Sequence, residues 1–248
     1  MKTGKDFIIF PLDVSTEAAA RQLVGMLHRD VGMFKIGLEL FVRCGPSLVQ
    51  WVADHGTAAI FLDLKLHDIP ITVERAMQGI ADLKVALTTV HCGESQAMLG
   101  AAVRGGGGKV GVLGVTVLTS VSGAQLRAVG YQDHLADDTQ RLVLLKAAMA
   151  RDAGCAGVVC SGHEVAAIKA RMGQSFLAVT PGIRPDWTSG VKKDDQHRVV
   201  TPAAAVTRGA DYLVIGRPIR DAADPAAAAR RIAAEIDKAL EAGTVNRD

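Results

Sequence analysis

The sequence predicts an α/β protein, a (β/α)8 TIM barrel. Eight short apolar runs alternate with Ala-rich segments of helical pattern, and the runs are apolar on both faces, as expected of parallel strands covered on both sides. The length of 248 residues suits one such barrel. A doubly wound open sheet is the main alternative, because periodicity alone does not distinguish it. No Pro/Gly/Ser-rich linker divides the chain, so we expect residues 1–248 to form one domain.

The elements follow one another in regular order. The third strand must end before Pro70, because proline cannot continue a strand ladder. The last helix has Pro225 in its first turn and Gly243 just beyond its end, a favoured pair of start and stop signals. The predicted strands are residues 7–12, 33–38, 59–66, 87–91, 110–118, 157–160, 176–180 and 212–215. The predicted helices are residues 16–28, 47–55, 71–83, 95–104, 139–153, 163–171, 202–208 and 225–242.

The composition excludes several classes of protein. A formal net charge of only +2 and an aromatic content of 4% argue against a nucleic acid polymer as partner. No apolar stretch approaches the length of a membrane span, and the N-terminal apolar run is too short for a signal peptide. The four cysteines form no C-x-x-C pair, so we expect reduced thiols in a cytoplasmic protein.

The most informative segment is FLDLKLHDIPIT, residues 61–72. Residues two apart in a strand point to the same face, so Asp63 and Lys65 should project together from the end of the third strand. Asp68 should lie on the turn that follows. A salt bridge closing a strand is the simpler interpretation of an isolated D-x-K pattern. In a barrel, however, the active site lies at the carboxyl ends of the strands, and this position favours a catalytic cluster.

Other predicted strands also end in polar residues, which should meet at the same end of the barrel. Arg217 offers a bidentate donor suited to phosphate, and Gly216 allows close approach of the backbone to a ligand. We therefore expect a phosphorylated substrate. The irregular segment 185–195 follows the seventh strand, and we expect it to act as a lid. The polar residues at the other strand ends are Asp13, Lys35, His91, Thr119, Ser120 and Arg184.

Seven motifs in order resemble the orotidine 5′-phosphate decarboxylase family. The resemblance implies a (β/α)8 barrel, a homodimer, and decarboxylation of orotidine 5′-phosphate to UMP and CO2 without a cofactor or metal. The motifs are PLD around Asp13, FKIG around Lys35, FLDLKLHDIP at 61–70, VTVLTS at 115–120, TPGIRP at 180–185, DQHRVVTP at 195–202 and VIGRPI at 214–219.

The resemblance also implies a role for each matching residue. Lys35, Asp63, Lys65 and Asp68 match the charged tetrad of the family, with Lys65 as proton donor to C6. Asp68 would reach the site of the other subunit, with Ile69 and Thr72 beside it. The implied substrate contacts are Asp13 to a ribose hydroxyl, Thr119 and Ser120 at the pyrimidine amide, and Arg184, Gln196, Gly216 and Arg217 at the phosphate.

The residues suggest how such chemistry would work. Loss of CO2 from C6 leaves a carbanion that the ring π-system does not delocalise, and no cofactor motif offers an electron sink. An ammonium at Lys65, placed by Asp63 and Asp68, would stabilise the developing charge and then deliver its proton.

Two departures and two alternatives accompany this interpretation. Ile71 replaces the usual Asn of the D-I-P-N-T motif, and the HCGES stretch at 91–95 differs from the family, so His91 and Cys92 receive no role. One alternative is a related barrel acting as a Mg²⁺-dependent sugar-phosphate decarboxylase or aldolase. The other is a phosphate-binding barrel that has lost catalysis. Lys35 and the TPGIR…DQ pairing favour the nucleotide enzyme, and the complete tetrad favours activity.

Overall fold

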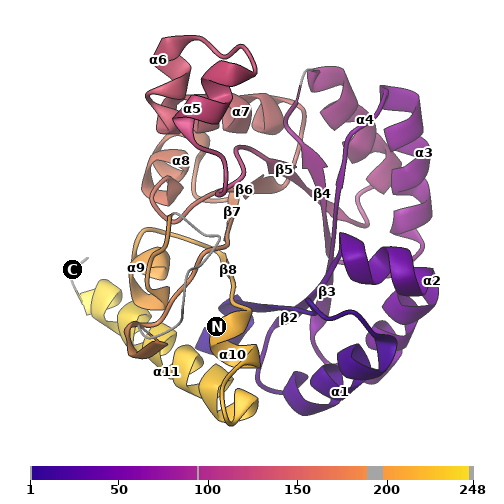
Figure 1. Ribbon diagram of the computed structural model, residues 1–248, viewed down its shortest axis with the longest axis vertical. Helices are drawn as coiled ribbons and strands as arrows, with labels where there is room; N and C mark the ends of the chain where they lie inside the picture. Colours follow the sequence, from indigo (N-terminus) through magenta and orange to yellow (C-terminus); the bar gives the residue numbers. More distant parts are fainter. Residues whose placement is uncertain (1, 94, 189–197, 246–248) are drawn as a thin grey trace.

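Eight parallel strands close into a barrel in the computed structural model, with helices around it (Figure 1). The structure describes residues 2–93, 95–188 and 198–245. Every strand pairs with its neighbours in sequence, and β1 pairs with β8 to close the ring. The predicted (β/α)8 barrel is confirmed. The strands are β1 (Ile8–Pro11), β2 (Met33–Gly37), β3 (Ala59–Leu66), β4 (Leu87–His91), β5 (Gly111–Val115), β6 (Gly157–Val159), β7 (Leu177–Thr180) and β8 (Tyr212–Val214).

The helices form the outer layer of the barrel (Figure 1). Short 3-10 helices lie at Gly4–Phe7 and Asp186–Thr188. Within the described residues, no helix is both long and apolar enough to cross a membrane. The helices are α1 (Glu17–Leu27), α2 (Leu38–His55), α3 (Pro70–Ala81), α4 (Gln96–Gly106), α5 (Gly123–Ala128), α6 (Asp133–Ala136), α7 (Thr139–Asp152), α8 (Val165–Met172), α9 (Pro202–Thr207), α10 (Arg217–Arg220) and α11 (Pro225–Val245).

Several predicted boundaries were wrong. The helix predicted from residue 47 is the second part of α2, which begins at Leu38 and is interrupted by a kink at Gly45, where φ is 64° and ψ is −165°. β5 ends at Val115, three residues earlier than predicted. Gly243 lies inside α11 and does not end it. The short helices α5, α6 and α10 were not predicted at all.

Two apolar layers stabilise the barrel. The larger layer lies between the strands and the helices and contains Phe10, Phe34 and Leu62. The smaller layer fills the inside of the barrel with one buried residue from each of six strands, and Val159 and Tyr212 complete it from β6 and β8. This inner layer forms the floor on which the polar residues at the carboxyl ends of the strands rest. Its six buried members are Ile9, Met33, Phe61, Leu87, Leu113 and Val179.

Candidate active site

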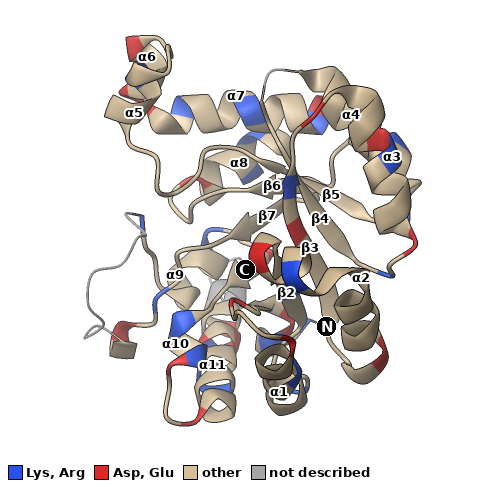
Figure 2. Cartoon of the chain, turned by 45° about the vertical axis from the view of Figure 1, so that its right-hand side comes forward, with Lys and Arg blue, Asp and Glu red and all other residues tan. Residues whose placement is uncertain are grey.

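The charged residues form the layer directly above the inner apolar floor. Lys35 lies two residues beyond Met33 on β2, and Asp63 lies two residues beyond Phe61 on β3. Because side chains alternate along a strand, this spacing directs both groups into the barrel. Acidic and basic bands are visible on β3 in Figure 2. The same alternation of side chains along the strands therefore places both the apolar floor and the charged cluster inside the barrel.

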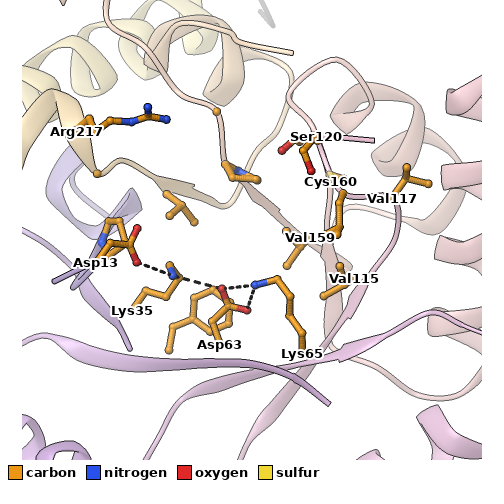
Figure 3. Close-up of a pocket in the computed structure, with 18 of the residues that line it drawn as sticks. Asp13, Lys35, Asp63, Lys65, Val115, Val117, Ser120, Val159, Cys160 and Arg217 are labelled. Carbon is orange, nitrogen blue, oxygen red and sulfur yellow. Dashed lines mark hydrogen bonds and ion pairs between the residues drawn. The ribbon is translucent and has the colours of Figure 1, made fainter. Parts of the chain in front are cut away.

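Four charged side chains form a continuous row along the pocket (Figure 3). Asp13 Oδ1 lies 3.3 Å from Lys35 Nζ, which lies 3.4 Å from Asp63 Oδ2. Asp63 Oδ2 lies in turn 2.8 Å from Lys65 Nζ. Two unit charges about 4 Å apart attract by roughly 4 kcal/mol at an effective dielectric near 20. The alternating signs therefore hold each ammonium group in place.

Asp63 is the buried centre of this row, with a side chain that is 9% exposed. Burial alone would raise its pKa. The ammonium groups of Lys35 and Lys65 and the hydrogen bonds from Lys65 and Thr89 outweigh burial and hold the pKa of Asp63 below its ordinary value. The carboxylate is therefore ionised at neutral pH and fixes a buried negative charge next to Lys65.

The backbone of Lys65 has an unusual conformation. Its φ is 51°, in the left-handed region that non-glycine residues seldom adopt, and the β3–β4 register shifts between Leu62 and Leu66. Buried Thr89 on β4 holds this conformation: its Oγ1 accepts from the Lys65 N–H at 2.9 Å and donates to Asp63 Oδ1 at 2.8 Å. Such strain persists only where neighbours enforce it, and it clusters at functional sites.

The pocket above the row has a volume of about 580 Å³. In Figure 3 the Arg217 side chain extends into the pocket from one side, and Ser120 lies on the other. The pocket is lined by the guanidinium groups of Arg184 and Arg217 as well as by the Asp63–Lys65 pair, and this combination suits an anionic ligand with a second reacting group. The predicted site residues that line the pocket are Asp13, Lys35, Asp63, Lys65, Thr119, Ser120, Arg184, Gly216 and Arg217.

Comparison with known proteins assigns the chain to a family. The sequence model described as "Orotidine 5'-phosphate decarboxylase / HUMPS family" matches residues 6–232. The chain belongs to this family. It is 52% identical to the orotidine 5′-phosphate decarboxylase of Desulfosudis oleivorans, over 97% of this chain and 96% of the relative. It is also 52% identical to that of Anaeromyxobacter sp. (strain K), over 91% and 96%.

A solved structure supports the same assignment. The crystal structure of orotidine 5′-phosphate decarboxylase from Lactobacillus acidophilus superposes with a TM-score of 0.80 at 34% identity, covering 93% of this chain and 98% of that one. The resemblance inferred from the seven motifs is thereby confirmed. These relatives are named orotidine 5′-phosphate decarboxylase, and their names favour that activity over the sugar-phosphate alternative considered from the sequence.

Three described residues that the family resemblance places at the site do not line this pocket, and a fourth is not described. Asp68, Ile69 and Thr72 are exposed and lie outside it, and Asp68 Oδ1 accepts from the Ile69 N–H at 2.6 Å. Gln196 lies outside the described residues, as do residues 189–195 of the expected lid.

The family motifs did not identify every residue of the site. Thr89 was missed because a threonine in an apolar run is typical of any strand. Arg220 lines the pocket and donates to the Asp13 carbonyl at 3.2 Å, which joins the ends of β8 and β1. Gly216 lies close to the end of β1, because a Cβ there would lie 3.0 Å from Pro11 Cγ and would make a tight contact.

The described residues contain no cluster of three or more His, Cys, Asp or Glu side chains that could hold a metal ion. Cys44, Cys92, Cys155 and Cys160 are free thiols.

His91 lies beside His67, with 5.7 Å between ring centroids. Burial, followed by the proximity of His67, Lys65 and Lys146, lowers the pKa of His91.

Proposed function

We propose that this chain decarboxylates orotidine 5′-phosphate to UMP and CO2 without a cofactor or metal. The observation that carries the proposal is the Lys65 ammonium, held 2.8 Å from buried Asp63 in a pocket that Arg184 and Arg217 also line. Membership of the family, and the names of relatives 52% identical over nearly the whole chain, support the same activity.

Lys65 is the proton donor in this proposal. Breaking the bond between C6 and the carboxyl group leaves an electron pair on C6. The Lys65 ammonium faces that developing charge and transfers a proton from Nζ to C6. Asp63 and Lys35 orient Lys65 before the reaction, so little reorganisation accompanies the step. Solvent then restores the proton to Lys65.

The remaining pocket residues bind the substrate. Arg184 and Arg217 hold the phosphate, with Gly216 allowing close approach, and Gln196 joins them from its place in the sequence motif. Asp13 accepts from a ribose hydroxyl, and Thr119 and Ser120 contact the pyrimidine amide. Binding energy from the distant phosphate keeps the reacting ring beside the charged row.

The active form in this proposal is a cytoplasmic homodimer of single-domain subunits in which Asp68 completes the partner's site. Asp68 and Ile69 lie between β3 and α3, and Thr72 lies in the first turn of α3; all three are exposed and lie outside their own pocket. Apolar side chains nearby are also exposed: Ile69 is 62% exposed and Ile71 is 51% exposed. A two-fold contact would cover these groups and bring Asp68 to the second site.

The test is the loss of orotidine 5′-phosphate absorbance on adding purified protein, with and without a chelator. We expect UMP formation at the same rate in both buffers. No turnover in either buffer would refute the proposed activity, and turnover abolished by the chelator and restored by Mg²⁺ would refute the metal-free reaction.

A further inference from the structure

An ion pair outside the pocket joins the turn after β6 to Arg198. Glu164, in the turn between β6 and α8, is paired with Arg198, and their side chains are 3% and 21% exposed. The other carboxylate oxygen of Glu164 accepts from the Ser161 N–H at 2.7 Å. Neither residue lines the pocket, and the proposed chemistry uses neither.

This pair is a poor source of stability. Removing both charges from water largely offsets their mutual attraction. Burial raises the pKa of Glu164 even though Arg198 and the Ser161 hydrogen bond oppose the shift. A well-packed apolar pair would serve stability equally well, so the contribution of this pair lies in the position of the segments that it joins.

Arg198 lies two residues before Val200 in the chain, and Val200 is hydrogen-bonded to two residues that line the pocket. The Val200 N–H donates to the Gly182 carbonyl at 3.2 Å, and the Arg184 N–H donates to the Val200 carbonyl at 2.9 Å. Ile183 and Val200 form a parallel bridge. Gly182 and Arg184 both line the pocket, so the position of Val200 determines where the backbone of Arg184 lies.

The turn that carries Glu164 also contacts Val200 directly. A Cβ on Gly162 would lie 2.3 Å from Val200 Cγ2, so only glycine leaves room for this valine. The turn after β6 therefore holds the 198–200 segment twice, through the Glu164–Arg198 pair and through the packing of Val200 on Gly162.

We propose that Glu164 and Arg198 are positioning residues that set the phosphate end of the site through Val200 and Arg184. The inference rests on the proposed role of Arg184 and Arg217 in binding phosphate. It predicts that loss of the pair weakens phosphate-dependent catalysis and leaves the chemistry at Lys65 intact.

The chain offers a matched control at the opposite end of the barrel. Lys169 on α8 is 5% exposed and pairs with Asp211 at 2.6 Å, and Asp211 also accepts from the Ala178 N–H at 2.7 Å. This pair is likewise buried and charged, but it lies at the amino-terminal ends of β7 and β8, away from the pocket.

The experiment compares kcat/KM for orotidine 5′-phosphate with kcat/KM for orotidine, which lacks the phosphate. For Glu164→Gln we expect the loss on the phosphorylated substrate to exceed the loss on orotidine by about tenfold or more. Gly162→Ala, which displaces Val200 without removing a charge, should show the same selective loss. Asp211→Asn should leave the ratio of the two constants at its wild-type value.

Equal fractional losses on both substrates for Glu164→Gln would overturn the inference, and Gly162→Ala decides by the same ratio if Glu164→Gln does not fold. Arg217→Ala, measured in the same way, distinguishes a failure of the phosphate assignment from a failure of the positioning role. A selective loss for Arg217→Ala without one for Glu164→Gln or Gly162→Ala refutes only the positioning role. A non-selective loss for Arg217→Ala refutes the phosphate assignment and the inference with it.

Discussion

Asp63 shows how a single residue can serve both the fold and the site. It belongs to the inward-facing side of β3, directly above Phe61, and it lies between two ammonium groups. A neutral residue at this position would remove the carboxylate that Lys35 and Lys65 share, although Lys35 would keep its ion pair with Asp13. The buried carboxylate is therefore what allows two lysines to occupy the same end of the barrel.

At the phosphate end, Arg217→Ala should weaken transition-state binding through the phosphate alone. We expect kcat/KM for orotidine 5′-phosphate to fall by about a hundredfold or more, with a much smaller loss for orotidine. Steady-state kinetics on both substrates measures the difference. Arg230→Ala on α11, which removes a surface arginine paired with Asp30, is the control. Equal fractional losses for Arg217→Ala would show that this residue does not act through the phosphate.

At the scale of elements, the junction of β3 and β4 shapes the reaction centre. Thr89 fixes the left-handed Lys65 backbone and orients Asp63 with one hydroxyl group. Thr89→Val keeps the shape but leaves the Lys65 N–H without this acceptor, at a cost of about 1–3 kcal/mol in the free energy of unfolding. We expect a clear fall in kcat because Lys65 loses its orientation.

The neighbouring Thr88 provides the control for this prediction. It is also fully buried, but its hydroxyl donates to the Leu62 carbonyl, away from the charged row. Thr88→Val should lower the free energy of unfolding with little change in kcat. Thr89→Ser, which keeps the hydroxyl group, should retain activity. Urea unfolding and steady-state kinetics would be measured on all three variants. If Thr89→Val and Thr88→Val have the same kcat, Thr89 has no special role.

The end of β4 should also make stability depend on pH. The pKa of His91 lies below its usual 6.5, so the unfolded chain takes up this proton more readily than the folded protein. The contribution of neutral His91 to the free energy of unfolding should therefore be lost as the pH falls below about 6.5. Urea unfolding between about pH 7.5 and 5.5 should show a smaller decline for His91→Gln than for wild type. Parallel curves would contradict the assigned shift.

Much of this arrangement could be predicted from the sequence, for identifiable reasons. Two-sided apolar runs revealed the strands, and Pro70 marked the end of β3. The left-handed turn at Lys65 could not be predicted, because D-L-K-L alternates like any regular strand. The first turn of α5 was readable in principle: Ser122 and Gln125 form a capping box. The contact of Arg220 with Asp13 could not be predicted either, because it depends on the closure of the ring, which brings the segments after β8 and β1 together.

At the scale of the whole molecule, the proposed dimer places Asp68 in the partner's site. Lys65→Ala and Asp68→Ala homodimers should each be nearly inactive. In a mixed dimer one site carries both lesions and the other carries neither, so mixing the variants should restore up to about a quarter of wild-type activity per total site for random pairing. Subunit exchange would be verified by mass spectrometry. No recovery despite exchange would place Asp68 in its own subunit's site.

The central claim is that the Lys65 ammonium protonates C6 as CO2 leaves. The most direct measurement is turnover of orotidine 5′-phosphate in D2O, with the UMP product examined by NMR. Wild-type protein should give UMP carrying deuterium at C6, and Lys65→Ala, though folded, should lose several orders of magnitude in kcat. A Lys65→Ala variant that retains more than about a tenth of wild-type kcat, a change of less than ~1.4 kcal/mol in the barrier, would contradict the claim.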